Sequence, residues 1–322
     1  MAKKKTNIVI VVSRGLPTVW ANEIANEYKA AHFRTPNDEK KQIQDAIVGA
    51  HALINCPRPL YDDSLIDMSG GTLQWIHIGG AGVEEFLTPR LITSDITLTN
   101  GRIIQGPEVA DHTLALVLTL TRNIHHVLRD QPATNPRPIE LRGKSAVVVG
   151  VGGIGLLIAE RLHSFGVQVT GVDQKYTPMM STLHNVVTPD HLFDVLPNAD
   201  LIICAAPSTQ KSQKMFNKKA FSLMKKTAFF VNVSRGALVD TEAMTECLLD
   251  DGLSGIGLDV SDPEPLPSTH PLNNDKRVVI TPHIAGLSEH NRDRSKVLAR
   301  KNIGRFLRNE PLFNVVDKNQ GF

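Results

Sequence analysis

Near its N-terminus, the chain carries short β-prone hydrophobic runs separated by polar stretches with helix-compatible composition. These runs lie at residues 8–12, 52–54, 75–78 and 96–99. Strands that alternate with helical segments are typical of α/β units, in which successive strands are parallel. The pattern therefore predicts a first α/β unit.

A second and more regular series of apolar runs follows at residues 146–149, 167–172, 201–204, 229–233, 256–260 and 278–280. The runs are almost continuously apolar, as expected of strands buried on both faces of a parallel sheet. Residues 154–165 between the first two runs predict a helix that stops at Gly166. Asp240 can cap a later helix that Gly252 ends. Six strands with helical crossovers predict a doubly wound sheet.

The two series are joined by a helical segment and a proline-rich segment. Residues 109–129 have helical periodicity, with no glycine or proline to interrupt it. Residues 131–138 hold three prolines and predict a linker, because proline removes a backbone donor and cannot continue a helix.

The last part of the chain predicts a helix that extends to Arg308 and leaves the second sheet after Gly286. We expect this helix to return to the first unit, which makes that unit discontinuous. The predicted domains are therefore residues 1–104 with 287–322, and residues 105–286.

Composition and charge narrow the classes of function. A chain of 322 residues fits two domains, and 35 Lys and Arg against 33 Asp and Glu give a net charge of only +2. This charge is too small to recruit nucleic acid or an anionic membrane by its field alone. The basic C-terminal helix is interrupted by Asp293 and followed by Glu310, so a solvated face is the expected interpretation. The predicted partner is a small molecule bound in a shaped site, without nucleic acid or membrane.

Cysteine and histidine usage gives no sign of a metal centre. The three cysteines, Cys56, Cys204 and Cys247, are widely scattered, which predicts reduced thiols and a cytoplasmic protein. The twelve histidines are dispersed, so no metal site is expected. No apolar run approaches the ~20 residues of a membrane-spanning helix.

A glycine-rich turn lies directly after the strand predicted at 146–149 and directly before the helix. It reads Gly150-Val151-Gly152-Gly153-Ile154-Gly155, a GxGxxG sequence. The first glycine permits the tight turn, the second admits a pyrophosphate, and the third lets helix and strand pack closely. The candidate cofactor-binding residues of the turn are Gly150, Gly152, Gly153, Ile154 and Gly155.

Asp173 ends the next apolar run, at the spacing at which an acidic group binds the adenosine ribose hydroxyls. Its charge would repel a 2′-phosphate, so the sequence predicts NAD as the cofactor. Lys175 is close enough in sequence to leave the strictness of this choice open.

Three polar residues follow later strands: Arg235, Glu264 and His283. Ligands of open α/β sheets bind outside the carboxyl ends of the strands, so these side chains are predicted to converge beside a bound nicotinamide. Reduction of a keto acid needs a cation for the substrate and a proton donor for the developing alkoxide. Taken singly, each residue also fits a structural role, as a surface arginine or as a loop glutamate or histidine.

The chain carries four longer motifs: GVGGIG at 150–155, NVSRGALVD at 232–240, GLDVSDPEP at 257–265 and TPHIAG at 281–286. In these motifs it resembles the D-isomer-specific 2-hydroxy acid dehydrogenases. The resemblance implies an α/β fold of two doubly wound parallel-sheet domains. One would be a Rossmann NAD-binding domain at 105–286, and the other a discontinuous flavodoxin-like substrate domain.

The resemblance also implies roles for individual residues. Arg235 would bind and polarise the substrate, His283 would be the acid/base, and Glu264 would raise its basicity. Asp259 would meet the nicotinamide carboxamide, and the cofactor pocket would be lined by Val233 and Ala206. Backbone amides near the following residues would receive the substrate carboxylate: Gly80, Ala81 and Gly82. A homodimer is implied, with the 109–129 helix near its interface.

The expected activity is NAD(H)-dependent reduction of a small 2-keto acid to the D-2-hydroxy acid, as in glyoxylate and hydroxypyruvate reductases. Cys56 stands where phosphoglycerate dehydrogenases of the family tend to have an arginine, although Arg58 is close by. Formate dehydrogenases of the superfamily lack an acid at position 264, which argues against their chemistry. Two alternatives stay open: a D-3-phosphoglycerate dehydrogenase, and a non-catalytic NAD-sensing protein of the corepressor kind.

Overall fold

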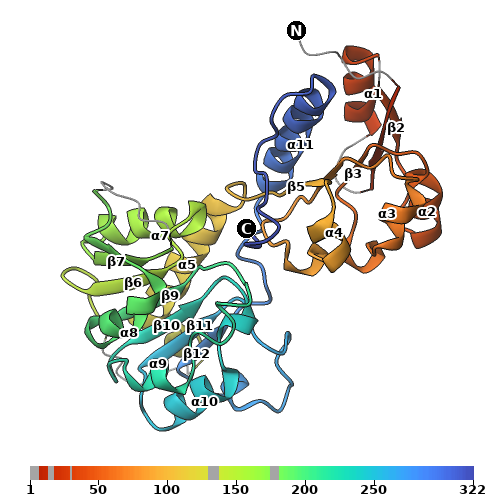
Figure 1. Ribbon diagram of the computed structural model, residues 1–322. Helices are drawn as coiled ribbons and strands as arrows, with labels where there is room; N and C mark the ends of the chain where they lie inside the picture. Colours follow the sequence, from red (N-terminus) through yellow and green to blue (C-terminus); the bar gives the residue numbers. More distant parts are fainter. Residues whose placement is uncertain (1–6, 14–17, 30, 130–137, 175–180) are drawn as a thin grey trace. The chain divides into compact units, whose positions relative to one another are not determined.

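The computed structural model describes residues 7–13, 18–29, 31–129, 138–174 and 181–322. The chain divides into two compact units (Figure 1). Unit 1 holds Met1–Gln105 and Ser288–Phe322, and unit 2 holds Gly106–Leu287. The linker predicted at 131–138 falls almost entirely outside the described residues.

Unit 1 contains a five-stranded parallel sheet. In chain order its strands are β1 (Ile8–Val12), β2 (Ala31–Arg34), β3 (Ala52–Ile54), β4 (Trp75–His77) and β5 (Thr97–Thr99). Their order across the sheet is β2-β1-β3-β4-β5, which is the flavodoxin order. The sequence pattern did not predict β2, because only Ala31 of this edge strand is fully buried. The predicted flavodoxin-like architecture is confirmed.

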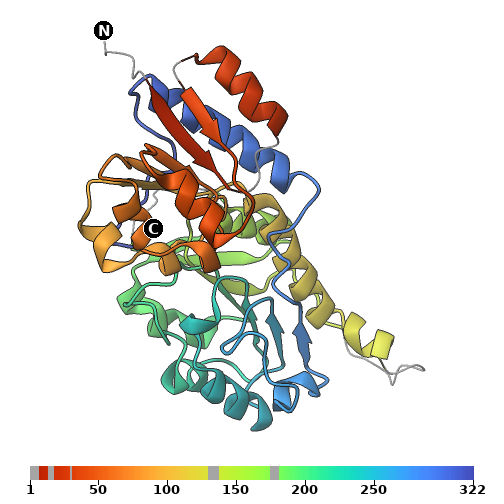
Figure 2. The same cartoon turned by 90° about the vertical axis from the view of Figure 1, so that its right-hand side faces the viewer.

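Helices cover both faces of this sheet, which explains why its central strands are apolar on both sides. One face packs against α1 (Thr18–Glu27) and α11 (Asn291–Leu307), and Figure 2 shows α11 running alongside β1 and β2. The other face packs against α2 (Lys40–Ile47), α3 (Ser64–Met68) and α4 (Pro89–Thr93). The C-terminal helix therefore belongs to the first unit.

Unit 2 contains a seven-stranded parallel sheet. Its strands are β6 (Ser145–Val149), β7 (Gln168–Val172), β8 (Asn185–Val187), β9 (Leu201–Cys204), β10 (Phe229–Asn232), β11 (Gly255–Leu258) and β12 (Val278–Ile280). The order β12-β11-β10-β9-β6-β7-β8 is that of a Rossmann sheet with one further strand beyond β11. The predicted set of six strands lacked β8, a short edge strand with no fully buried residue.

Helices also lie on both faces of this second sheet. One face packs against α5 (Gly106–Thr121) and α7 (Gly153–Ser164), with α6 (Ile124–Arg129) following α5. The other face packs against α8 (Leu192–Val195), α9 (Lys218–Ser222) and α10 (Thr241–Leu249). Short 3₁₀ turns lie at Arg58–Leu60, Glu84–Phe86, Pro189–His191, Leu196–Asn198, Gly236–Leu238 and Pro271–Asn273.

Two helix predictions need correction. The helix expected over 109–129 is broken into α5 and α6, because Asn123 takes a left-handed backbone conformation with φ 57°. Asparagine tolerates that conformation and ends a helix without glycine or proline. Asp240 caps α10 as expected by accepting from the Ala243 amide at 3.2 Å, but the helix ends at Leu249, before Gly252.

Membrane spans and metal clusters are both missing from the described ranges. No helix in them is both long and apolar enough to cross a membrane. They also hold no group of three or more histidine, cysteine, aspartate or glutamate side chains placed to bind a metal ion.

A buried histidine makes the stability of unit 1 dependent on pH. His77 lies on β4 with none of its surface exposed, and its Nδ1 is 2.9 Å from the Thr99 hydroxyl oxygen. The same oxygen accepts a hydrogen bond from the Trp75 indole at 2.8 Å. Burial lowers the pKa of His77 from 6.5 to about 4. The folded protein therefore holds this side chain neutral at pH values at which an unfolded chain takes up a proton.

We expect the free energy of unfolding to fall as the pH decreases from about 6.5 toward 4, because the unfolded chain binds a proton that His77 cannot bind. The loss from this residue is on the order of 1.4 kcal/mol per pH unit. Urea unfolding of His77→Gln should show a shallower decline with acid than the wild type. His32→Gln, at an exposed position in the same unit, is the matched control. Equal acid dependence in wild type and His77→Gln would contradict the prediction.

Candidate active site

The glycine-rich turn joins β6 to α7 and contains two positions that only glycine can occupy. Gly150 has φ +88°, and a Cβ atom there would lie 2.5 Å from the Cα of Ala206. A Cβ atom on Gly155 would lie 1.9 Å from the carbonyl oxygen of Gly150. These close approaches set the tight turn and the packing of α7 against β6.

Gly152 differs from these two glycines, because the space where its Cβ atom would lie is open for 4 Å around. It is the N-cap of α7, whose first two residues are Gly153 and Ile154. The first amides of a helix have no partner within the helix and carry its positive dipole end, so they attract phosphate. Together, the open space and the helix start fit the pyrophosphate of a dinucleotide.

Asp173 lies directly after β7 and reaches back to the glycine turn. Its Oδ2 accepts a hydrogen bond from the Val151 amide at 2.9 Å. The carboxylate is thus fixed beside the turn, and its contact with a ribose stays a prediction. Ala206 lies against Gly150 in the loop after β9, and Val233, 8% exposed, follows β10. Because β6 and β9 are neighbours, this is the switch point of the sheet, where ligands of such folds bind.

His283 and Glu264 form a hydrogen-bonded pair beyond the ends of β12 and β11. The His283 Nδ1 lies 2.7 Å from the Glu264 Oε1, and both side chains are close to half exposed. The backbone of His283 is left-handed, with φ 54°. Its amide donates to the carbonyl oxygens of Asp259 and Thr281, both at 3.0 Å. The structure thus joins two of the three predicted catalytic side chains directly.

Arg235 belongs to a turn that the buried side chain of Asn232 organises. Asn232, 1% exposed, accepts from the amide and the hydroxyl of Ser234 at 3.0 Å and donates to the Arg235 carbonyl at 2.9 Å. A Cβ atom on Gly236 would lie 2.0 Å from the Ser261 carbonyl oxygen, so the Arg235 turn packs against the segment that leads to Glu264. The carboxyl ends of β10, β11 and β12 are in register, which places all three predicted residues at one edge of the sheet.

The carboxylate of Asp259 lies inside the loop that carries His283. The residue is 2% exposed and accepts from the Thr281 hydroxyl at 2.7 Å, the Ile284 amide at 2.9 Å and the Ala285 amide at 3.0 Å. These hydrogen bonds fix the 281–285 loop. The contact of Asp259 with a carboxamide stays a prediction.

Cys204 also lies at this edge, at the end of β9, with its Sγ 3.1 Å from the Ser234 hydroxyl. Burial raises the pKa of its thiol to about 11. Burial therefore favours the neutral form of this thiol.

The loop with Gly80, Ala81 and Gly82 belongs to unit 1, after β4. Two carbonyl oxygens of this loop accept hydrogen bonds from the residues that follow β5. The Gly80 carbonyl accepts from the Gly101 amide at 2.7 Å, and the Ala81 carbonyl accepts from the Asn100 side-chain amide at 2.6 Å. The assignment of this loop to a substrate carboxylate stays a prediction.

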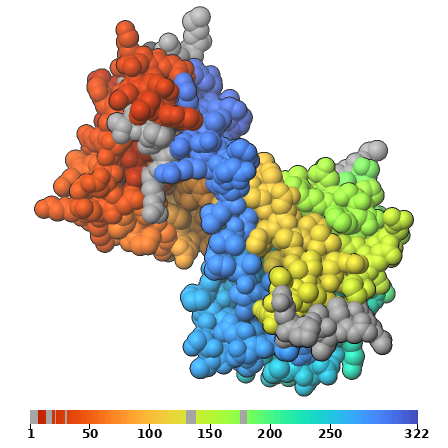
Figure 3. Space-filling view, turned by 180° about the vertical axis from the view of Figure 1, so that it is seen from behind, coloured from red at the N-terminus to blue at the C-terminus, as the bar shows by residue number. Residues whose placement is uncertain are grey.

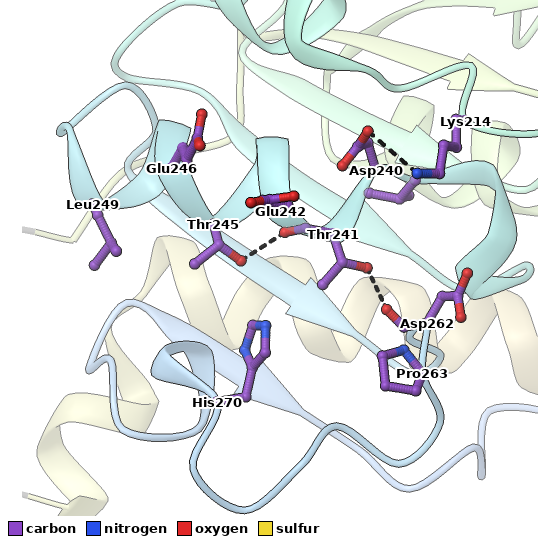
Figure 4. A pocket seen from close by; sticks show the side chains of 11 residues that line it. Lys214, Asp240, Thr241, Glu242, Thr245, Glu246, Leu249, Asp262, Pro263 and His270 are labelled. Atoms are coloured by element: carbon purple, nitrogen blue, oxygen red, sulfur yellow. Dashed lines mark hydrogen bonds and ion pairs between the residues drawn. The ribbon is translucent and has the colours of Figure 1, made fainter.

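A pocket of about 440 Å³ lies elsewhere on unit 2, between α10 and the segment with Asp262, Pro263 and His270. Figure 4 shows Lys214 paired with Asp240, and Thr241 donating to the Asp262 carbonyl, at 2.7 Å. Neither Glu264 nor His283 lines this pocket.

Sequence reasoning did not assign Asn232, Thr281 or His112 to the site. Asn232 and Thr281 lie within motifs that resembled the family, and His112 lies in the helix predicted at 109–129, but their importance depends on hydrogen bonds to residues of other segments. One signal was available in the sequence: Asn232 is a polar residue that closes an otherwise apolar run.

Comparison with known proteins identifies the family. Residues 114–285 match the model of the D-isomer specific 2-hydroxyacid dehydrogenase, NAD binding domain. A glyoxylate reductase/hydroxypyruvate reductase of Homo sapiens is 29% identical over 317 residues, covering 94% of this chain and 96% of the human protein. A glyoxylate reductase of Thermofilum pendens is 32% identical over 251 residues, covering 74% of this chain and 73% of the relative. The crystal structure of a protein from Thermus thermophilus superposes with a TM-score of 0.77 at 29% identity, covering 96% of this chain and all of that chain.

The family model spans more than half of the chain and coincides with the unit that holds the glycine turn, Arg235, Glu264 and His283. The chain therefore belongs to the D-isomer specific 2-hydroxyacid dehydrogenases, which are NAD-binding oxidoreductases.

Proposed function

We propose that the protein reduces a small 2-keto acid to the D-2-hydroxy acid with NADH, as a reductase of the glyoxylate and hydroxypyruvate type. The observation that carries this proposal is the 2.7 Å hydrogen bond between His283 Nδ1 and Glu264 Oε1. The pair lies at the carboxyl edge of the same sheet that carries the glycine turn. A histidine paired with a carboxylate is a proton donor suited to neutral pH.

The residues of unit 2 fit the dinucleotide. Gly150, Gly152, Gly153, Ile154 and Gly155 would hold the pyrophosphate, and Asp173 would bind the ribose hydroxyls. Ala206 and Val233 would line the pocket, and Asp259 would meet the carboxamide. When bound, NADH supplies the hydride that reduces the keto carbon.

His283 would supply the proton. Its Nδ1 is held by Glu264, so we assign Nε2 as the atom that donates to the oxygen of the keto group. The hydrogen bond to Glu264 fixes the direction of the ring. Arg235 would bind the substrate carboxylate and polarise its carbonyl, because a guanidinium offers a rigid pair of donors for oxygen atoms.

The substrate is proposed to be small and unphosphorylated. Arg58, the basic residue near position 56, already donates to the Tyr61 carbonyl at 3.2 Å and lies 3.5 Å from the carboxylate of Glu85. Its charge is thus partly compensated within unit 1, which disfavours a phosphate-binding role. The amides of Gly80, Ala81 and Gly82 are proposed to receive the substrate carboxylate.

We also propose a homodimer and a cytoplasmic location. The exposed side of α6 carries three large apolar side chains with exposed fractions of 44%, 40% and 71%: Ile124, Val127 and Leu128. This helix lies on the surface of unit 2 that is visible in Figure 3. An apolar surface of this kind is typical of a protein interface. All three cysteines are free, which fits a reducing compartment.

We expect light scattering after gel filtration to give twice the mass of one chain. Leu128→Asp should shift the protein toward the monomer, because the new charge would have to be desolvated in the interface. Leu249→Asp, at a leucine on α10 that is 55% exposed, is the control and should leave the mass unchanged. A monomeric wild type would overturn the dimer proposal.

Alanine should affect stability at the crowded Gly155 and cofactor affinity at the open Gly152. Gly155→Ala should destabilise the fold by about 1–3 kcal/mol or more, because its Cβ atom would overlap the Gly150 carbonyl. Gly152→Ala meets no protein atom and should unfold like the wild type, while NADH affinity falls about tenfold or more. Thermal unfolding and NADH fluorescence titration measure the two effects. Wild-type NADH affinity in Gly152→Ala would exclude this position from the pyrophosphate site.

The function is tested by following oxidation of NADH and NADPH with a panel of 2-keto acids. We expect turnover with glyoxylate and hydroxypyruvate, faster with NADH than with NADPH, and little with phosphorylated hydroxypyruvate. Preference for the phosphorylated acid would favour a phosphoglycerate dehydrogenase. NADH binding without turnover of any acid would favour the non-catalytic alternative.

Two variants test the roles within this reaction. His283→Ala should lower turnover by about 10²–10⁴-fold, with NADH affinity changed only a few fold. Glu264→Gln replaces the carboxylate that accepts from the His283 ring, so turnover should fall about tenfold or more while NADH affinity changes only a few fold. Wild-type turnover in Glu264→Gln would reject the role of Glu264.

A further inference from the structure

The backbone of His283 is held in an unusual conformation by its surroundings. A φ of 54° is uncommon for a residue other than glycine and persists only where neighbouring structure imposes it. The His283 amide donates to the carbonyls of Asp259 and Thr281, at the ends of β11 and β12. The direction of the imidazole therefore depends on how Asp259 and Thr281 are held.

Asp259 is a buried carboxylate, and such a group needs several donors. Two of the donors are amides of the 281–285 loop, and the third is the hydroxyl of Thr281. The carboxylate thus binds both ends of the segment that contains His283. Without the Thr281 hydroxyl, the first end of this segment has no side-chain link to Asp259.

The directions of these hydrogen bonds connect the Asp259 network to His112 on α5. The Thr281 hydroxyl has one hydrogen, which it donates to Asp259 Oδ1 at 2.7 Å. The Nε2 of His112 lies 2.9 Å from the same hydroxyl oxygen, so His112 is the donor in that contact. The Nε2 of His112 also lies 3.5 Å from Asp259 Oδ1. His112, far away in the sequence, thus supports the hydroxyl that donates to this carboxylate.

We infer that Thr281 and His112 are positioning residues for the proton donor, which act through Asp259 on the backbone conformation of His283. The inference rests on the proposed function and deepens it. Neither side chain is assigned contact with the substrate. Their removal should misalign His283 with Glu264, which lowers the rate of proton transfer more than it weakens NADH binding.

Paired variants separate positioning from packing. Thr281→Val keeps the shape of the side chain and removes the hydroxyl, whereas Thr281→Ser keeps the hydroxyl. His112→Leu removes the donor, whereas His112→Gln keeps an N–H group near the position of Nε2. We expect kcat to fall about tenfold or more in the valine and leucine variants. In the serine and glutamine variants it should stay within about threefold of the wild type.

Thr113→Val is the matched control. Thr113 follows His112 on α5, is fully buried and donates only to its own helix, at Val109 O. This variant loses a buried hydroxyl without touching the loop and should keep the wild-type kcat. Thermal unfolding of all variants shows whether an effect follows stability. Equal kcat in Thr281→Val and Thr281→Ser would overturn the inference, as would a fall in kcat in all variants that merely follows lost stability.

A second measurement does not depend on turnover. The Nδ1 proton between His283 and Glu264 should give a downfield proton NMR signal, assigned by its absence in His283→Ala. We expect the signal to be lost or displaced in Thr281→Val and His112→Leu, and kept in Thr281→Ser and His112→Gln. If the wild type reduces no 2-keto acid, the proposed function fails and this signal alone decides the positioning. An unchanged signal in Thr281→Val would overturn it.

Discussion

The buried carboxylate of Asp259 is the constraint on which the arrangement of the site depends. A carboxylate that is 2% exposed must be surrounded by donors, or its charge would not be tolerated at that depth. The chain supplies these donors from the Thr281 hydroxyl and from two amides of the loop after β12. Satisfying one buried charge therefore also fixes the loop that carries His283, and with it the approach to Glu264.

Buried polar side chains also order neighbouring loops at other strand ends. Asn232 closes β10 and uses its side chain to bind the turn that carries Arg235. In unit 1, Asn100 follows β5 and holds the Ala81 carbonyl. In each case a buried polar side chain can satisfy its own hydrogen bonds only by ordering a neighbouring loop. Rigid strands thus place loop residues that no regular secondary structure would hold.

The sequence was sufficient for the parts of the fold that depend on local pattern. Central strands were predicted because they are apolar on both faces, and the glycine turn because two of its positions exclude any side chain. The edge strands β2 and β8 lack that apolar signal. The break at Asn123 depends on a backbone conformation that several residue types tolerate. His112 and Thr281 could not be assigned, because their partners come from segments far apart in the chain.

The glycine turn depends on the backbone, whereas the ends of β10 to β12 depend on side chains. Substitutions in the two regions are therefore expected to have different effects. At the glycine turn, the proposed recognition of the cofactor comes from backbone amides and open space, and atoms added at Gly150 or Gly155 would displace the main chain itself. At the ends of β10 to β12, the proposed recognition comes from side chains whose directions depend on hydrogen bonds made by Asn232 and Asp259. A substitution there can keep the fold and the proposed cofactor site while His283, the proposed proton donor, is misaligned. Activity at this edge is therefore more fragile than stability, because catalysis requires finer alignment than folding does.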